Sequence, residues 1–232
     1  MRLGRARSVG LVGLRATLVD VEVSVGGGLP RTQIVGLPDA ALSEAKARCR
    51  AAVGTSGFEW PQHLVIVNLS PASLPKSGTH FDASIVAAVL AANGSVPQTR
   101  LDDAVVMGEV GLDGALRPAR GVLPAVLEAA RAGVGHAIVP LPQVREARLV
   151  EGIRVHGVAS VSELAALLRG EDVPERLPDV TPIEAARREP DLADVAGQPE
   201  ARWALEIAAA GAHHLYFKGP PGVGKTLLAE RL

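Results

Sequence analysis

A glycine-rich loop that ends in lysine and threonine constrains this chain more than any other stretch. The pattern G-x-x-x-x-G-K-[ST] is matched by Gly219, Pro220, Pro221, Gly222, Val223, Gly224, Lys225 and Thr226. Glycines let the backbone curl so that its N–H groups point inward at phosphate oxygens. Lys225 adds a point charge for the β- and γ-phosphates, and the Thr226 hydroxyl can ligate Mg²⁺. The loop therefore predicts a site for ATP and Mg²⁺.

The residues on both sides of this loop favour that interpretation over a chance glycine-rich turn. The preceding stretch, 215–218, is short and mostly apolar, as a buried strand would be. The following stretch, 226–232, contains helix formers with apolar residues spaced for one face. The order strand, loop, helix is the one that a phosphate-binding loop requires, with the positive end of the helix dipole facing the phosphates.

Hydrolysis of the nucleotide needs more than this loop. An acidic Mg²⁺ ligand on a second strand and groups that position water are also required, and the sequence ends at Leu232, inside the helix after the loop. We therefore expect the 232 residues to be the front part of a longer protein. By itself this part should bind no catalytic water and should not turn over ATP, so we assign no catalytic residue to it.

Composition predicts a folded protein rather than a disordered or membrane-spanning one. Hydrophobic residues make up 47% of the chain and charged residues 21%, which is enough to bury a core. The formal net charge of -1 shows no excess of positive charge that would indicate binding to nucleic acid or to an anionic membrane. Cys49 is the only cysteine, so no disulfide can form within the chain. With no apolar run long enough to cross a bilayer, we expect a cytoplasmic protein with no membrane partner.

The chain divides into three segments by pattern and composition. Residues 1–170 interleave strand and helix patterns, which predicts an α/β (or α+β) domain with helices covering a sheet. Residues 171–190 are rich in proline and charge and are interpreted as a linker. Residues 191–232 begin a second domain, which opens with a helix over 198–210.

Periodicity and turn residues place the elements of the first segment. Alternating apolar residues predict a strand over 16–25, and three glycines at 26–28 predict a hairpin turn to a second strand over 32–36. Further strands are expected at 63–69, 104–110, 136–140 and 153–156, the last at an edge. Helices are expected at 38–55, with Cys49 as a packing residue, and at 81–92 and 121–131. Asp113-Gly114 predicts a second hairpin turn, and Ser160 with Glu163 a capping box.

Other residues could carry chemistry, but simpler interpretations are favoured. Polar residues crowd one loop and could form a nucleophile with its base, although a polar surface loop is the favoured interpretation. They are Ser70, Ser73, Lys76, Ser77 and His80. Adjacent His213 and His214 point apart on an extended chain, which disfavours a metal site. The three remaining histidines are each expected to be isolated at the start or end of a strand, and they are His63, His136 and His156.

Both ends of the chain resemble the ComM/YifB family of magnesium-chelatase-like AAA+ ATPases. The segment 191–198, DLADVAGQ, is similar to the entry segment of AAA+ domains, and 205–215 followed by GPPG looks like the magnesium-chelatase-like subgroup. In the first segment, IVGLPD at 34–39, NLSPA at 68–72, LPKSG at 74–78 and Phe81-Asp82 are similar to the ComM/YifB family. The resemblance implies a first domain of the ribosomal-protein-S5-domain-2-like or Lon-protease-like type, then the beginning of a P-loop AAA+ domain.

The resemblance to Lon-type proteases can be tested at their catalytic positions. The Lon motif Pro-Lys-Asp-Gly-x-Ser aligns with residues 75–80 and puts His80 where the nucleophilic serine would be. The frame that carries the partner lysine puts Leu123 at that position. With both members of the dyad missing, we expect the fold without peptidase activity.

For the complete protein the resemblance implies an ATP-driven homo-hexamer. Some family members act as DNA helicases in branch migration during natural transformation, which makes DNA an expected partner by resemblance only. Three alternatives stay open: a Lon-like peptidase, disfavoured by the missing dyad; a metal-chelatase ATPase subunit for tetrapyrrole synthesis; and a non-catalytic nucleotide-binding module.

Overall fold

The computed structural model describes residues 2–13, 15–177 and 191–231. The chain divides into two compact units, residues 1–178 and residues 179–232. The greater part of the predicted linker, 178–190, lies outside the described residues.

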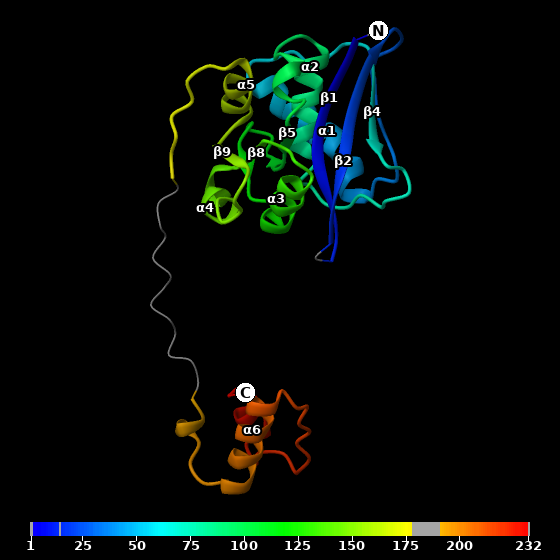
Figure 1. The fold of residues 1–232 in the computed structure, drawn as a ribbon. Coiled ribbons are helices and arrows are strands. Elements are labelled where there is room, and N and C mark those ends of the chain that lie inside the picture. The colour runs from blue at the N-terminus through cyan, green and yellow to red at the C-terminus, as the bar shows by residue number, and fades with distance from the viewer. Residues whose placement is uncertain (1, 14, 178–190, 232) are drawn as a thin grey trace. The chain divides into compact units, whose positions relative to one another are not determined.

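The described part of the larger unit is built around a sheet of seven strands in the order β3-β4-β2-β1-β5-β8-β9 (Figure 1). Its strands are β1 (Arg2–Val12), β2 (Arg15–Gly26), β3 (Arg31–Val35), β4 (Leu64–Ser70), β5 (Ala104–Val106), β8 (His136–Pro140) and β9 (Arg154–Val158). The three central strands β4, β2 and β1 pair antiparallel, and every other pairing in the sheet is parallel. The unit is therefore a mixed α/β fold with a mostly parallel sheet, as the interleaved patterns predicted.

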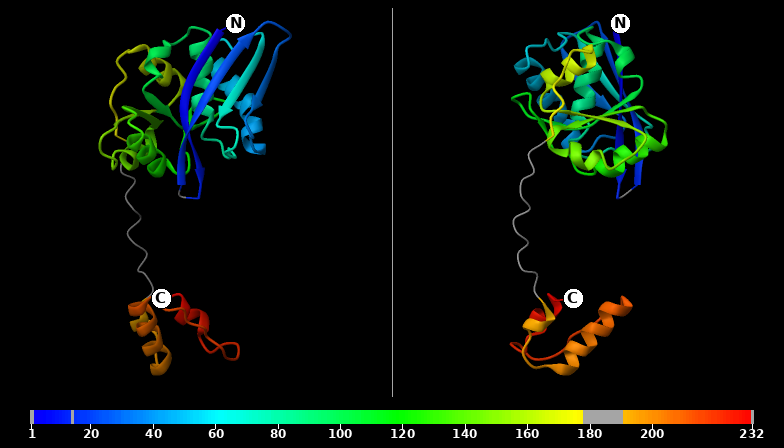
Figure 2. Two further views of the ribbon diagram at one scale, coloured as in Figure 1. Left: turned by 45° about the vertical axis from the view of Figure 1, so that its right-hand side comes forward. Right: turned by 60° about the vertical axis from the view of Figure 1, so that its left-hand side comes forward.

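Two sets of helices cover the two faces of this sheet (Figure 2). Because neighbouring residues of a strand point to opposite faces, Ile138 of β8 belongs to one core cluster while Ala137 and Val139 belong to the other. The first cluster packs under α1 (Ala40–Thr55), α2 (Asp82–Ala92) and α5 (Val161–Arg169). The second packs under α3 (Val122–Arg131) and the short α4 (Val144–Ala147). Strands β5 and β8 are therefore buried on both faces, which explains the short continuous apolar runs AVV and AIVP in them.

The shorter elements also follow local signals. Asp39 caps α1 by accepting the N–H of Leu42 at 2.7 Å, and Ser160 caps α5 by accepting the N–H of Glu163 at 3.2 Å. A two-stranded hairpin of β6 (Glu109–Val110) and β7 (Leu116–Arg117) confirms the turn predicted at Asp113-Gly114. The continuous strand predicted over 104–110 is instead divided into β5 and β6 at Gly108, whose φ of 148° a side chain would not tolerate.

One strand prediction in the larger unit needs correction, and one strand was not predicted at all. Residues 32–36 do not return as a hairpin partner of β2, since β3 lies at the sheet edge and pairs parallel with β4. The arginine-rich N-terminus, which local pattern left unassigned, forms β1 in the middle of the sheet and pairs with β2 along its whole length. Its arginines face carboxylates across that pair, Arg5 to Glu22 at 3.4 Å and Arg7 to Asp20 at 3.7 Å. These pairs give Arg5 and Arg7 carboxylate partners on β2.

The described part of the smaller unit holds η3 (Leu192–Asp194), α6 (Pro199–Gly211) and α7 (Lys225–Ala229). Its apolar core is small, with Val195, Leu205 and Leu228 at its centre. The strand expected over 215–218 is wrong for this structure: these residues form no strand, and the Tyr216 side chain is 85% exposed. An apolar stretch becomes a buried strand only when other strands pair with it, and no described residue pairs with this one.

Candidate functional site

The glycine-rich loop of residues 219–224 connects the extended stretch after α6 to the start of α7. Gly222 and Gly224 have φ angles of 84° and 83°, in the left-handed region that glycine adopts without strain. A Cβ added at Gly222 would meet no atom within 4 Å, so the space beside this residue is open. Backbone curvature at these two glycines thus shapes the loop as the sequence predicted.

Several hydrogen-bond donors of this loop have no partner among the described residues. No described carbonyl accepts the N–H of Gly222, Val223 or Gly224, and the exposed Thr226 hydroxyl has no hydrogen-bond partner among the described residues. Backbone N–H groups without a protein partner in such an exposed or half-buried stretch can bind water or an anion. This donor set suits phosphate oxygens, and the threonine hydroxyl suits Mg²⁺.

Lys225 folds back over the same loop. Its Nζ donates to the carbonyl oxygens of Gly219 at 2.9 Å and Pro220 at 2.7 Å. An ammonium group binds an anionic oxygen more strongly than a neutral carbonyl, so phosphate oxygens would compete for this group. The residues present therefore fit a nucleotide phosphate.

Gln198 holds the other side of the loop, a role that the sequence analysis did not assign. Its Nε2 donates to the Val223 carbonyl at 2.6 Å, and its backbone has a positive φ of 51° at the start of α6. The side chain thereby ties α6 to the loop. Its position in the segment 191–198 is the only sequence signal that could have indicated this contact.

The polar loop of residues 70–80 is the expected surface loop only in part, because Ser73 and Ser77 are exposed whereas Lys76 and His80 are buried. Lys76 is 1% exposed and His80 is 6% exposed. The Lys76 ammonium donates to the Pro71 carbonyl, and His80 Nε2 lies 2.8 Å from the Val9 carbonyl oxygen. Within the described residues no serine hydroxyl of this loop bonds to Lys76 or His80, so the loop brings no nucleophile and base together.

Burial shifts the pKa of both groups. Burial lowers the pKa of His80, with the Val9 carbonyl and Asp39 opposing the change, and burial also lowers the pKa of Lys76. At the second Lon catalytic position, Leu123 is a partly buried apolar residue packed against the second core cluster. The two residues at the Lon catalytic positions, His80 and Leu123, are therefore packed into the domain.

A buried ion pair next to this loop also escaped the sequence analysis. Asp82 is fully buried and accepts two bonds from Arg48, from Nε at 2.8 Å and from Nη2 at 3.0 Å. Burial raises the pKa of Asp82 and its bonds to Arg48 lower it. Cys49, the neighbour of Arg48 on α1, is buried against the Asp82 carbonyl, which confirms its role as a packing residue. Burial raises the pKa of the Cys49 thiol well above its ordinary value, so it is not a nucleophile.

The histidines divide into two groups. His136 and His156 are not isolated as expected, because Nδ1 of one lies 3.0 Å from Nε2 of the other. His63, His213 and His214 are exposed. No cluster of three or more metal-ligating side chains exists among the described residues, and none of the described helices is both long and apolar enough to cross a membrane.

Comparison with known proteins identifies the class to which this arrangement belongs. The family described as "Subunit ChlI of Mg-chelatase" matches residues 21–143, and the one described as "Magnesium chelatase, subunit ChlI" matches residues 191–232. The chain therefore belongs to the magnesium-chelatase-like proteins, and within them to the ComM/YifB family.

Individual relatives match along the whole chain. "Uncharacterized protein Rv2897c" of Mycobacterium tuberculosis is 50% identical over 235 residues, which is 100% of this chain and 46% of the relative. "Uncharacterized protein YifB" of Escherichia coli is 37% identical over 232 residues and "Competence protein ComM" of Haemophilus influenzae 38% over 239 residues, each with the same coverage. "DNA repair protein RadA" of Escherichia coli is 29% identical over 154 residues, 65% of this chain and 32% of the relative. The chain thus spans about half the length of the relatives that match all of it, 46% in each case.

Proposed function

We propose that this chain is the N-terminal portion of an AAA+ ATPase whose phosphate-binding loop is residues 219–226. The observation that carries the proposal is the curved loop with free N–H groups at Gly222, Val223 and Gly224 and with Lys225 folded over it. ATP binds with its phosphates against these groups and Mg²⁺ at the Thr226 hydroxyl. Hydrolysis would supply the energy for movement.

The proposed activity of the complete protein is ATP-driven movement on DNA, in the manner of a helicase that migrates branched junctions. The printed names of two relatives support it, since one is a competence protein and another a DNA repair protein. The proposed assembly is a homo-hexamer in the cytoplasm, and the larger unit is a non-catalytic contact or assembly module. Because Arg5 and Arg7 are paired with carboxylates, we place the main DNA contacts outside the described residues.

A second candidate is the ATPase subunit of a metal chelatase. The observation that favours it is the description of the matching families, which names a subunit of magnesium chelatase. The two candidates share the nucleotide site and differ in the substrate that the ATPase moves or loads. Lon-like peptidase activity is disfavoured because His80 and Leu123 occupy the dyad positions, and both are packed into the domain.

The test is strand displacement by a protein of the relatives' length that contains this chain. A branched DNA with one labelled strand is incubated with ATP and Mg²⁺, using the parent protein, Lys225→Ala and the matched control Lys218→Ala, which removes an exposed lysine just before the loop. We expect ATP-dependent release of the labelled strand by the parent and the control, and a loss of at least about a hundredfold in Lys225→Ala. Equal strand release without ATP, or by Lys225→Ala, would contradict the proposal. An ATPase that releases no strand but drives Mg²⁺ insertion into a porphyrin would establish the second candidate instead.

A further inference from the structure

A group of arginine and histidine side chains gathers on strands β8 and β9 at one edge of the sheet, within the larger unit. In the register of the parallel strands, Ala104 of β5, His136 of β8 and Arg154 of β9 lie side by side, so the three side chains share one face. His156 lies two residues further along β9 and shares that face as well. It is the face covered by α5, and Leu167 and Leu168 of α5 close the inner end of the group.

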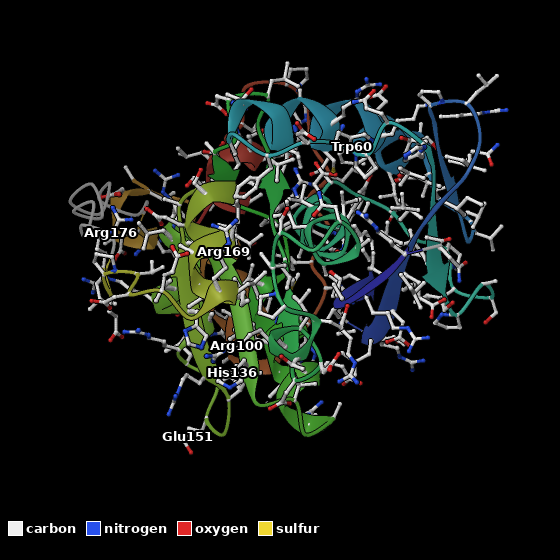
Figure 3. All side chains as sticks on the ribbon, turned by 90° about the horizontal axis from the view of Figure 1, so that it is seen from above. Trp60, Arg100, His136, Glu151, Arg169 and Arg176 are labelled. Carbon is white, nitrogen blue, oxygen red and sulfur yellow. The ribbon has the colours of Figure 1, made fainter. Side chains whose placement is uncertain are left out.

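Arg100 completes the group from the turn before β5. A Cβ added at Gly170 would lie 2.8 Å from Arg100 Nη2, which places the guanidinium against the end of α5. Figure 3 shows Arg100 and His136 close together, with Trp60 well away from them. Two adjoining cavities open here: one of about 130 Å³ is lined by Arg100, His136, Arg154 and His156, and one of about 430 Å³ shares Arg154 and His156 with it.

The arginines of this group differ in whether a carboxylate neutralises them. At the rim of the larger cavity, Arg148 pairs with Glu175 and Arg176 pairs with Glu163. Arg100 and Arg154 have no carboxylate or other hydrogen-bond acceptor among the described residues. Two uncompensated guanidinium groups therefore face cavities that also present an imidazole pair.

We propose that Arg100, Arg154, His136 and His156 form a binding site for the phosphate group of a small phosphorylated compound, separate from the glycine-rich loop. Guanidinium groups present forked N–H donors that match phosphate oxygens, and imidazole adds a further donor. The bond between His136 and His156 fixes both rings and leaves Nε2 of His136 and Nδ1 of His156 outside their mutual bond.

Cavity size and charge favour a small ligand over a nucleic acid strand. A cavity of about 430 Å³ falls in the range of small-molecule sites. The Glu175 carboxylate lines the same cavity, where it pairs with Arg148 rather than with Arg154. The electrostatic environment also fits an unfilled anion site, since burial and then the neighbouring His136 and Arg154 lower the pKa of His156.

The site can be tested in the full chain carrying Lys225→Ala, so that the glycine-rich loop does not contribute. Pyrophosphate is the probe, calorimetry gives its affinity, and NMR follows the imidazole resonances. The variants are Arg100→Ala and Arg154→Ala, with Arg50→Ala as the matched control, because Arg50 is an exposed arginine of α1 that lines neither cavity. Circular dichroism establishes that each variant is folded.

We expect pyrophosphate to shift the resonances of His136 and His156 and to leave those of His63 unchanged. Each of Arg100→Ala and Arg154→Ala should weaken binding at least about tenfold, the loss typical of one charge-assisted hydrogen bond, while Arg50→Ala should bind like its parent. Pyrophosphate binding that is absent, or that is unchanged in folded Arg100→Ala and Arg154→Ala, would overturn the proposal. Binding that depends on these arginines with a single-stranded oligonucleotide but not with pyrophosphate would overturn the assignment to a small ligand.

Discussion

At the scale of single residues, the larger unit buries ionisable side chains at the junction of α1, α2 and the loop before α2. The Asp82 carboxylate accepts two bonds from Arg48, whereas the His80 ring has, among the described residues, only the Val9 carbonyl as a hydrogen-bond partner. The Asp82 carboxylate is a buried charge whose stability depends on its partner, whereas burial disfavours the charged form of His80. Each gives a separate prediction.

Removing Arg48 should be strongly destabilising. Arg48→Met would leave the Asp82 carboxylate buried without its partner, which should lower the free energy of unfolding by about 3–5 kcal/mol. Urea unfolding followed by circular dichroism measures the change. The double variant Arg48→Met with Asp82→Leu should recover much of the loss, because no buried charge remains. A single variant within about 0.5 kcal/mol of the parent would show that the pair contributes nothing.

His80 should make the stability depend on pH. Its pKa in the folded state lies below the ordinary value near 6.5 because of burial. Between the pKa of His80 in the folded chain and its pKa in the unfolded chain, the unfolded chain binds the proton more readily. The stabilisation is therefore complete above about pH 6.5. Below that pH the free energy of unfolding falls, by at most about 1.4 kcal/mol per pH unit. The pKa of His156 is lowered too and contributes with the same sign. Urea midpoints measured from about pH 7.5 to 5.5 should fall less steeply in His80→Gln than in the control His63→Gln; equal slopes would refute this role of His80.

At the scale of elements, α2 approaches the sheet closely because β1 offers it a glycine. A Cβ on Gly4 would lie 2.0 Å from the Ala88 carbonyl oxygen and 2.6 Å from the Ala92 nitrogen, both backbone atoms of α2. No side-chain rotation relieves such a contact, so the helix itself would have to move. Gly4 therefore sets the distance between the helix and the sheet.

Gly4→Ala should accordingly destabilise the larger unit by about 2–4 kcal/mol, as overpacking against rigid backbone does. Gly26→Ala is the matched control, since a Cβ at the end of β2 meets nothing within 4 Å. Thermal unfolding of both variants measures the difference. A Gly4→Ala protein as stable as the control would mean that α2 does not pack as described.

Elements with a strong local pattern could be predicted from the sequence, whereas those defined by distant partners could not. The cap residues Asp39 and Ser160 and the turn at Asp113-Gly114 each carry their own signal, and helices α1, α3 and α5 appeared where expected. β1 has Gly4, Ser8 and Gly10 at buried positions where an alternating pattern would have larger apolar residues, and it becomes a strand through pairing with β2 and β5. β3 follows a glycine-rich turn that suggests a hairpin, but its partner β4 lies some thirty residues further along the chain.

The candidate site, too, has features that a local sequence pattern predicts and features that depend on distant residues. The shape of residues 219–226 followed from glycine and lysine chemistry, because the relevant contacts are within the loop itself. The contact from Gln198 and the pairing of His136 with His156 join residues on different elements. Only the fold brings those side chains together, so no local pattern could indicate them.

At the scale of the whole molecule, the apolar core is distributed unevenly. Both large core clusters draw only on residues between Ala6 and Leu168, and the cluster of the smaller unit is centred on three residues, Val195, Leu205 and Leu228. We propose that residues 1–170 are an independent domain, that 171–190 are a linker and that 191–232 begin a second domain. Contacts of Glu175 with Arg148 and of Arg176 with Glu163 extend the first compact unit slightly past that boundary.

A fragment of residues 1–178 should therefore fold alone, because it contains both large clusters. We expect a single cooperative unfolding transition whose midpoint matches the first transition of the whole chain. Limited proteolysis of the whole chain should cut first between Glu171 and Pro190. Early cleavage between residues 80 and 130, or a fragment without a cooperative transition, would contradict the proposed boundary.

The measurement that tests the central claim most directly is equilibrium binding of a fluorescent ATP analogue with Mg²⁺ to a protein of the relatives' length that contains this chain. Lys225→Ala removes the ammonium that lies over the loop carbonyls, and Lys218→Ala removes an exposed lysine before the loop and serves as the control. The account predicts saturable binding by the parent and the control, and a loss of at least about tenfold in Lys225→Ala. Equal affinity of Lys225→Ala and the parent, in folded protein, would show that residues 219–226 do not hold the nucleotide.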